Sequence, residues 1–419
     1  MITSDTLKLR LSRAIDRDAA VALLREAIHH DSVTGHEGDF AHFLARELEA
    51  LDADRVTLRE FAPARPNVWA TRRGSGGGRR LMFVGHTDTV HAHGWRERWA
   101  SDPREDPWGA PVLDGEIWGR GAGDLKAGIC TVLLALRALD RAGLRLEGDV
   151  VCAFVGDEES GEPGSGVSAG IKALIPLLRS GEVPPPDFAV YVEPTQLNVY
   201  AAQMGFLILD VRIQGKSAYF GVPELGIDAL KGAHAVLSEL WRYSDQLGVC
   251  ARHPLVGSAF LLVTSIAGGG SIAVPGACSL SLIRKLLPSE TLSTAREELE
   301  SVIRSALGPG LTVEFNYPAG RDHPVGGTPY ETDPTQAPIE MLCRSLARVD
   351  PAHGQIEGAA YWSEASFLAS LGIPTVYCAP GDIRNCHTHE ERVSVDEFLS
   401  AIEAFGLFMA EFCGVEEID

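Results

Sequence analysis

The residues best suited to chemistry are His86 and Asp88, which directly follow a short apolar segment, 81–85. On an extended chain, residues i and i+2 point to the same side, so the sequence predicts that this imidazole and this carboxylate face one site. Ligands of α/β sheets bind outside the carboxyl ends of the strands. An isolated His-x-Asp also fits a histidine that only completes a hydrogen bond in the core, and the pair alone leaves both interpretations open.

Three further apolar segments end in an acid or a histidine: 149–156 before Asp157, Glu158 and Glu159, 188–192 before Glu193, and 373–381 before a loop with His387 and His389. Neighbouring carboxylates raise one another's pKa unless a cation compensates their charge. The simplest physical account of three consecutive acids at a strand end is therefore a bound metal ion.

Asp124 follows a glycine-rich stretch, 113–123. It precedes an apolar segment, 129–139, that is typical of a buried helix ending near Gly143. A carboxylate in this place fits a helix N-cap, and the glycines fit a phosphate cradle. Neither interpretation accounts for the acids after the next strand.

Five nitrogen and oxygen donors on separate elements remain as candidate metal ligands: His86, Asp124, Glu159, Glu193 and His387. Such a mixed set suits zinc and can hold two ions about 3.5–4 Å apart around a shared carboxylate.

The chain has 419 residues, a length typical of two or three domains, and its 45% hydrophobic and 22% charged residues are typical of globular proteins. A net charge of −20 argues against nucleic acid, because phosphate binding needs a clustered basic surface. We expect no membrane contact and a cytoplasmic location, since no apolar run is long enough to span a bilayer and the N-terminal segment is unlike a signal peptide. The scattered cysteines lack a Cys-x-x-Cys pair, which predicts reduced core thiols.

Taken together, these motifs make the sequence similar to the di-zinc amidohydrolases and metallopeptidases related to acetylornithine deacetylase, succinyl-diaminopimelate desuccinylase, aminoacylase and glutamate carboxypeptidase. Almost the whole chain takes part in the resemblance. It implies that His86 and His387 bind metal, that Asp124 bridges two ions, that Glu159 and Glu193 complete the ligands, that Glu158 is a general base and that Asp88 supports His86. Two Zn²⁺ ions are the implied cofactors, with Co²⁺ or Mn²⁺ able to replace them.

The implied reaction is hydrolysis of an amide bond in an N-acyl amino acid or small peptide with a free carboxylate. Glu158 would take a proton from water and return it to the leaving amine. Asp88 would hold the second ring nitrogen of His86, and Arg284 could pair with a substrate carboxylate.

The middle of the chain alternates strand and helix patterns in the order strand, helix, two strands, helix, strand: 207–213, 228–247, 259–267, 277–287, 289–307 and 311–317. This order predicts a ferredoxin-like α+β domain, 203–318, inserted between two parts, 1–202 and 319–419, of an α/β catalytic domain with a mixed sheet flanked by helices. The resemblance implies that the insertion closes over substrate as a lid and forms a homodimer.

The insertion departs from the family's pattern. Tyr219 stands where relatives have an oxyanion-stabilising histidine, Ile272 replaces an asparagine before Pro275, and Leu282 replaces an aspartate. Tyr219 can still donate one hydrogen bond, although packing accounts for it equally well. Two alternatives therefore stay open: a relative recast for unusual acyl groups or for non-hydrolytic acyl transfer, and a metal-binding relative without catalysis.

Overall fold

The computed structural model describes residues 3–160, 164–250 and 252–418. The chain divides into two compact units: Met1–Ala201 with Thr332–Glu357 and Phe367–Asp419 form the first, and Ala202–Glu331 with Gly358–Ser366 form the second. The second unit starts next to the predicted insertion, 203–318, but continues beyond it to Glu331. One reason is that strand β16 (Gly326–Gly327) still pairs with strand β10 (Gly205–Gln214) of the second unit.

The main sheet runs in the order β1 (Asp54–Ala62), β2 (Arg65–Arg72), β7 (Val150–Val155), β3 (Leu81–His86), β8 (Phe188–Tyr191), β19 (Thr375–Tyr377), β9 (Val199–Gln203) and β17 (Tyr330–Glu331), with β18 (Ile356–Ala359) also paired to β9. β7, β3, β8 and β19 are parallel neighbours, whereas the remaining neighbours in this order pair antiparallel. The predicted mixed sheet flanked by helices is therefore confirmed. The carboxyl ends of four adjacent parallel strands lie along one edge, where α/β sheets bind ligands.

Helices cover both faces of this sheet because its central strands are apolar on both sides. Phe83 of β3 stacks on Phe405 of α11 (Val395–Cys413). A Cβ at Gly85 would meet Ile129 of α5 (Ala127–Arg141), on the same face. On the opposite face, Asn67 donates to the carbonyl of Gly170 in α6 (Ala169–Ser180).

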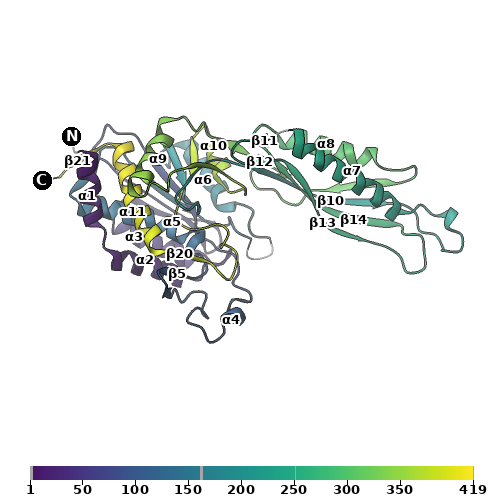
Figure 1. Cartoon of the computed structure of the whole chain (residues 1–419), viewed down its shortest axis with the longest axis horizontal. Coiled ribbons are helices and arrows are strands. Elements are labelled where there is room, and N and C mark those ends of the chain that lie inside the picture. Colours follow the sequence, from purple (N-terminus) through teal and green to yellow (C-terminus); the bar gives the residue numbers. More distant parts are fainter. Residues whose placement is uncertain (1–2, 161–163, 251, 419) are drawn as a thin grey trace. The chain divides into compact units, whose positions relative to one another are not determined.

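The other helices of the first unit are α1 (Ser4–Ala14), α2 (Arg17–His29), α3 (Gly38–Glu49), α4 (Trp95–Arg98) and α9 (Ala337–Val349), while α10 (Ala365–Ala369) crosses the boundary between the units. Two small sheets complete the first unit: β4 (Val112–Leu113), β5 (Glu116–Trp118) and β20 (Arg392–Ser394) form one, and β6 (Leu144–Leu146) and β21 (Val415–Glu417) form the other. Figure 1 shows α1, α2, α3 and α11 gathered in the first unit, close to both chain ends.

The second unit has the predicted strand and helix order: β10, α7 (Ala229–Cys250), β13 (Phe260–Gly268), β14 (Ala277–Leu286), α8 (Leu292–Ser305) and β15 (Thr312–Asn316). Its strands lie in the order β13, β14, β10, β15, the arrangement of a ferredoxin-like fold, and a short pair, β11 (Arg252–His253) and β12 (Gly257–Ser258), precedes β13. One apolar core joins both helices to the sheet: Leu209 and Leu282 from the strands are fully buried with Val236 of α7 and Leu299 of α8. A role of this unit as a lid stays a prediction.

Within the described ranges, no helix combines the length and the apolar character that crossing a membrane requires. All eight cysteines are free, and most of them are buried.

Candidate metal centre

The five predicted donors come together at the carboxyl edge of the parallel strands. His86 ends β3, Glu159 follows β7 and Glu193 follows β8, while Asp124 lies in the short irregular turn Ala122–Lys126 before α5 and His387 lies in a loop. Donor atoms of His86, Asp124 and Glu159, all buried, lie within 4.8 Å of one another.

Asp124 is the centre of this cluster, because each of its carboxylate oxygens faces a different imidazole. Oδ1 lies 3.0 Å from Nε2 of His86, and Oδ2 lies 3.1 Å from Nε2 of His387. Glu193 adds an oxygen 3.8 Å from Nε2 of His86, and Glu159 adds one 2.6 Å from Nε2 of His387. The donors thus form two groups that share Asp124.

The donor spacing fits a common cation in each group. Two ligands about 2.0–2.1 Å from one tetrahedral zinc lie roughly 3.3 Å apart, and the four donor distances lie on either side of that value. Imidazole nitrogens and carboxylate oxygens are both good zinc ligands, so the residues present fit zinc.

The charges of the cluster are strongly coupled. Burial disfavours a charged His387, but hydrogen bonds to Asp124 and Glu159 raise the pKa of His387 to about 11. Burial also opposes a charged His86, yet Asp124 and Glu193 raise its pKa well above the usual value. Burial and the nearby charge of Asp124 raise the pKa of Glu159 to about 6. The carboxylates therefore need positive charge close by, from imidazolium groups or from a cation.

Asp124 does not cap a helix, so that alternative is wrong. Helix α5 begins at Ala127, and no side chain caps its first turn, where Lys126 is the N-cap residue. The backbone of Asp124 departs from helical geometry, with φ −119° and ψ 91°. This local turn directs the carboxylate to the two imidazoles.

Asp88 makes contacts other than those expected. Nδ1 of His86 lies 2.9 Å from the backbone oxygen of Asp88, whereas the nearest oxygen of the Asp88 carboxylate lies 4.0 Å away. The carboxylate accepts hydrogen bonds from the backbone N–H groups of Glu158 (3.2 Å) and Glu159 (2.8 Å) and from the hydroxyl of Thr34 (2.9 Å). Asp88 thus fixes the turn that carries Glu158 and Glu159.

Asp157 was not among the predicted ligands, and its carboxylate makes contacts outside the donor cluster. Asp157 lies in the left-handed region, with φ 73°, and its carboxylate pairs with Arg65 at 2.7 Å. The same carboxylate accepts the N–H groups of Gly166, Val167 and Ala169. Burial would raise the pKa of Asp157, but these hydrogen bonds lower it. Glu158 lies between Asp157 and Glu159 and is 9% exposed.

Three residues that support the site were not among the predicted ones. Thr34 holds Asp88, Arg65 pairs with both Glu37 (2.8 Å) and Asp157, and Arg120 pairs with Glu391. The only local signal for Thr34 was an interruption of the helical apolar periodicity at residues 31–35 of the sequence. The partners of Arg65 and Arg120 are too distant in sequence for any local pattern to indicate them.

Arg284 is not available to a substrate in this structure, contrary to the prediction. Its side chain is 1% exposed and pairs with Glu290 at 2.7 Å, while Nε donates to the hydroxyl of Tyr243 at 3.0 Å. Alternation along β14 points Cys278, Leu280, Leu282 and Arg284 to the helix-covered face of the second unit. Arg284 is therefore a core ion-pair residue.

Tyr219 lies in the second unit, in the segment between β10 and α7, and its side chain is 62% exposed. Its ring packs beside that of Phe220, with centroids 4.6 Å apart. Although the ring contacts Phe220, the high exposure of Tyr219 leaves the phenol accessible to solvent. The predicted substrate contact of Tyr219 stays a prediction.

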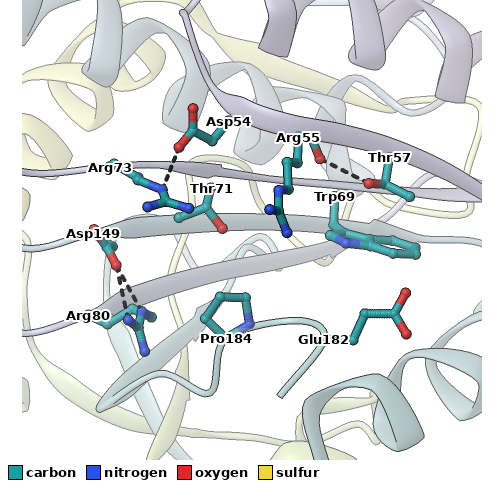
Figure 2. A pocket seen from close by; sticks show the side chains of 10 residues that line it. All are labelled: Asp54, Arg55, Thr57, Trp69, Thr71, Arg73, Arg80, Asp149, Glu182 and Pro184. Carbon is teal, nitrogen blue, oxygen red and sulfur yellow. Dashed lines mark hydrogen bonds and ion pairs between the residues drawn. The ribbon is translucent and has the colours of Figure 1, made fainter. Parts of the chain in front are cut away.

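A pocket of about 330 Å³ lies elsewhere on the first unit, lined by residues that include Arg55, Trp69, Arg80 and Asp149 (Figure 2). Arg80 and Asp149 directly precede β3 and β7, so the pocket lies towards the amino ends of these strands. Arg80 is neutralised by Asp149 at 3.0 Å. The pocket is thus separate from the donor cluster at the carboxyl ends.

The chain resembles known proteins over most of its length. Residues 82–411 match the model of peptidase family M20/M25/M40. An acetylornithine deacetylase from Proteus mirabilis is 27% identical over 361 residues, which are 84% of each chain.

Solved structures share the fold. Aminopeptidase PepT from Bacillus cereus superposes with a TM-score of 0.75 and 18% identity, covering 95% of this chain and 99% of that one. The YXEP protein of Bacillus subtilis, described as a dinuclear metal-binding peptidase, superposes with a TM-score of 0.65 and 15% identity, covering 95% and 98%. The chain belongs to peptidase family M20/M25/M40, a family of enzymes that hydrolyse amide bonds.

Proposed function

We propose that this protein binds two Zn²⁺ ions and hydrolyses an amide bond in an N-acyl amino acid or a small peptide. The observation that carries the proposal is the carboxylate of Asp124, whose two oxygens face His86 and His387 separately. Glu193 would complete the group around His86, and Glu159 the group around His387. Co²⁺ and Mn²⁺ suit the same nitrogen and oxygen donors.

Zinc in such a site lowers the pKa of water and polarises a carbonyl oxygen. Glu158 is the residue of this chain suited to move the proton, because it lies next to the ligand Glu159 and is not needed in either donor group. It would take a proton from the attacking water and deliver it to the leaving amine. Asp88 would fix the positions of Glu158 and Glu159 by accepting hydrogen bonds from their backbone N–H groups.

The free carboxylate of the substrate loses its predicted partner, because Arg284 is buried in an ion pair. The substrate class is therefore supported by family membership and by the similarity to an acetylornithine deacetylase. Tyr219 is the remaining predicted contact, and its exposed hydroxyl could donate one hydrogen bond to an oxyanion.

The proposal is tested on protein that has been gently purified and then reconstituted with zinc. Elemental analysis should find two metal ions per chain, and only trace metal would refute the site.

A screen of N-acyl amino acids and dipeptides, with zinc or cobalt added, should identify a hydrolysed substrate. Products are to be identified by mass, because acyl transfer in place of hydrolysis would give a different product. Two bound ions without turnover of any substrate would favour a non-catalytic relative.

A homodimer formed by the second unit, in the cytoplasm, is also part of the proposal. β13 is one of the two edge strands of that sheet, and Leu262 and Ile266 on it are 53% and 55% exposed. Edge strands with exposed apolar side chains are ready to pair with another chain. Light scattering should give the mass of two chains, and Leu262→Lys should shift it towards one.

A further inference from the structure

A buried ion pair lies behind the donor cluster. Arg120 donates from Nη1 to Oε2 of Glu391, and the two side chains are 3% and 1% exposed. Neither residue belongs to the two donor groups. Burying two charges costs solvation free energy, and apolar replacements of such pairs often leave stability unchanged or improved. Stability alone therefore does not account for this pair.

The remaining contacts of the pair reach both loops that carry metal donors. Oε1 of Glu391 accepts the backbone N–H of Asp124 at 3.2 Å. Nη2 of Arg120 donates to the backbone oxygen of Thr388 at 3.2 Å, and Thr388 follows His387 directly. One ion pair thus contacts the backbone at Asp124 and beside His387.

The pair is itself anchored by a strand ladder. β20 pairs antiparallel with β5, from Arg392 opposite Trp118 to Ser394 opposite Glu116. Where the ladder ends, the N–H of Gly119 donates to the backbone oxygen of Glu391 at 3.2 Å. Arg120 and Glu391 therefore lie where two paired segments separate into the Asp124 loop and the His387 loop.

We propose that Arg120 and Glu391 are positioning residues that hold Asp124 and His387 close enough to share a metal ion. The proposal rests on the proposed function, since it assigns these loops a metal. It predicts that losing the pair weakens the ion held by Asp124, Glu159 and His387 more than the ion held by His86 and Glu193. Partners that orient metal ligands commonly contribute roughly 10–100-fold to metal affinity.

Two double variants remove the pair without leaving an unpaired buried charge. Arg120→Met with Glu391→Leu abolishes both loop contacts. Arg120→Met with Glu391→Gln removes the charges and the contact with Thr388 but keeps an acceptor for the N–H of Asp124. The second variant is the milder one and keeps the test decisive if the first fails to fold. Circular dichroism and thermal unfolding establish that each variant is folded at the temperature of measurement.

The measured quantity is the zinc affinity of the metal-free protein, by competition with a chelator, together with the number of ions bound. We expect the first variant to lose roughly 10–100-fold in affinity for one of the two ions, and the second variant to lose less. A matched control is Arg98→Ala with Glu390→Gln, an exposed ion pair of 3.2 Å between α4 and the His387 loop, whose side chains are 54% and 41% exposed. Its removal should change zinc affinity by less than about twofold.

The outcomes separate the two proposals. If the parental chain binds two ions and a folded variant binds both with parental affinity, the positioning role is refuted and the proposed function stands. A lower melting temperature with unchanged zinc affinity would likewise make the pair purely structural. If the parental chain takes up no zinc, both the proposed function and the positioning role are refuted.

Discussion

Replacing Glu158 by Gln tests the assignment of the general base most directly. Glu158 is 9% exposed and holds its place through its backbone N–H, which bonds Oδ1 of Asp88 at 3.2 Å. Gln has nearly the same shape and leaves that backbone bond intact, so the change removes the ability to take up a proton and little else. Loss of a general base commonly costs about 10²–10⁴-fold in rate, which corresponds to about 3–5 kcal/mol of activation free energy. We expect that loss in kcat with both metal ions retained.

The neighbouring acid Asp157 provides the matched control. Its carboxylate faces Arg65 and three backbone N–H groups and makes no contact with the five donors in the structure described. Asp157→Asn weakens a buried, charge-assisted set of hydrogen bonds and should lower the free energy of unfolding by about 1–3 kcal/mol. Metal content and kcat of the folded variant should stay close to the parental values.

The two variants are compared by elemental analysis, by thermal unfolding and by kcat and KM on a substrate found in the screen. Parental turnover by Glu158→Gln would make Glu158 structural. Loss of a metal ion from the same variant would make it a ligand instead of a base. A folded Asp157→Asn variant that retains metal but loses turnover as strongly would show that the acids of this turn have been assigned wrongly.

Three further variants test other parts of the structure. Tyr219→Phe should lower kcat by roughly 10²–10³-fold with little change in KM if the hydroxyl stabilises an oxyanion, whereas an unchanged rate would make Tyr219 a packing residue. Thr34→Val removes the hydroxyl that bonds the buried carboxylate of Asp88 at 2.9 Å and should cost about 1–3 kcal/mol in urea unfolding; an unchanged midpoint would mean that Asp88 does not need this donor. Burial raises the pKa of Glu397 to about 7, so the folded state binds the proton of Glu397 more tightly than the unfolded state does. The contribution of Glu397 to the free energy of unfolding is therefore lost as the pH rises from about 4.5 to 7. Glu397→Gln should therefore stabilise the protein by about 1–3 kcal/mol at pH 8 and hardly at pH 4, and equal effects at both pH values would contradict this reasoning.

The sequence predicted the donor cluster because its signals are local. Each parallel strand is an apolar segment, and the residue type directly after it is visible in the sequence. Adjacent parallel strands end at one edge, so the donors after β3, β7 and β8 had to lie near one another once the strands were placed. The order of the strands was not visible: β7 inserts between β2 and β3, although the sequence places β2 and β3 next to each other. Non-local pairing of this kind has no periodic signal.

Side-chain direction could be predicted inside strands but not after their ends. Alternation along β14 already places Arg284 on the same face as Leu280 and Leu282, so its burial could have been foreseen from the sequence. Alternation fails at Asp88 and Asp157, which follow the last residues of β3 and β7. At Asp157 the left-handed backbone changes the direction of the side chain, and no residue type required that conformation there.

The separation of the acids into two sets also bears on the number of metal ions. Asp88, Asp157 and Glu391 each have their own donors: backbone N–H groups and a hydroxyl for Asp88, Arg65 with N–H groups for Asp157, and Arg120 for Glu391. The cluster at the carboxyl edge of the sheet contains four further carboxylates: Asp124, Glu158, Glu159 and Glu193. With neutral imidazoles, one divalent ion leaves this group with two uncompensated negative charges, whereas two ions neutralise it. In a buried site, two uncompensated charges cost electrostatic free energy, and this cost favours two ions over one. For Glu158→Gln the same count leaves one excess charge with either one or two ions, so the expected retention of both metals rests on the five ligands, which all stay in place.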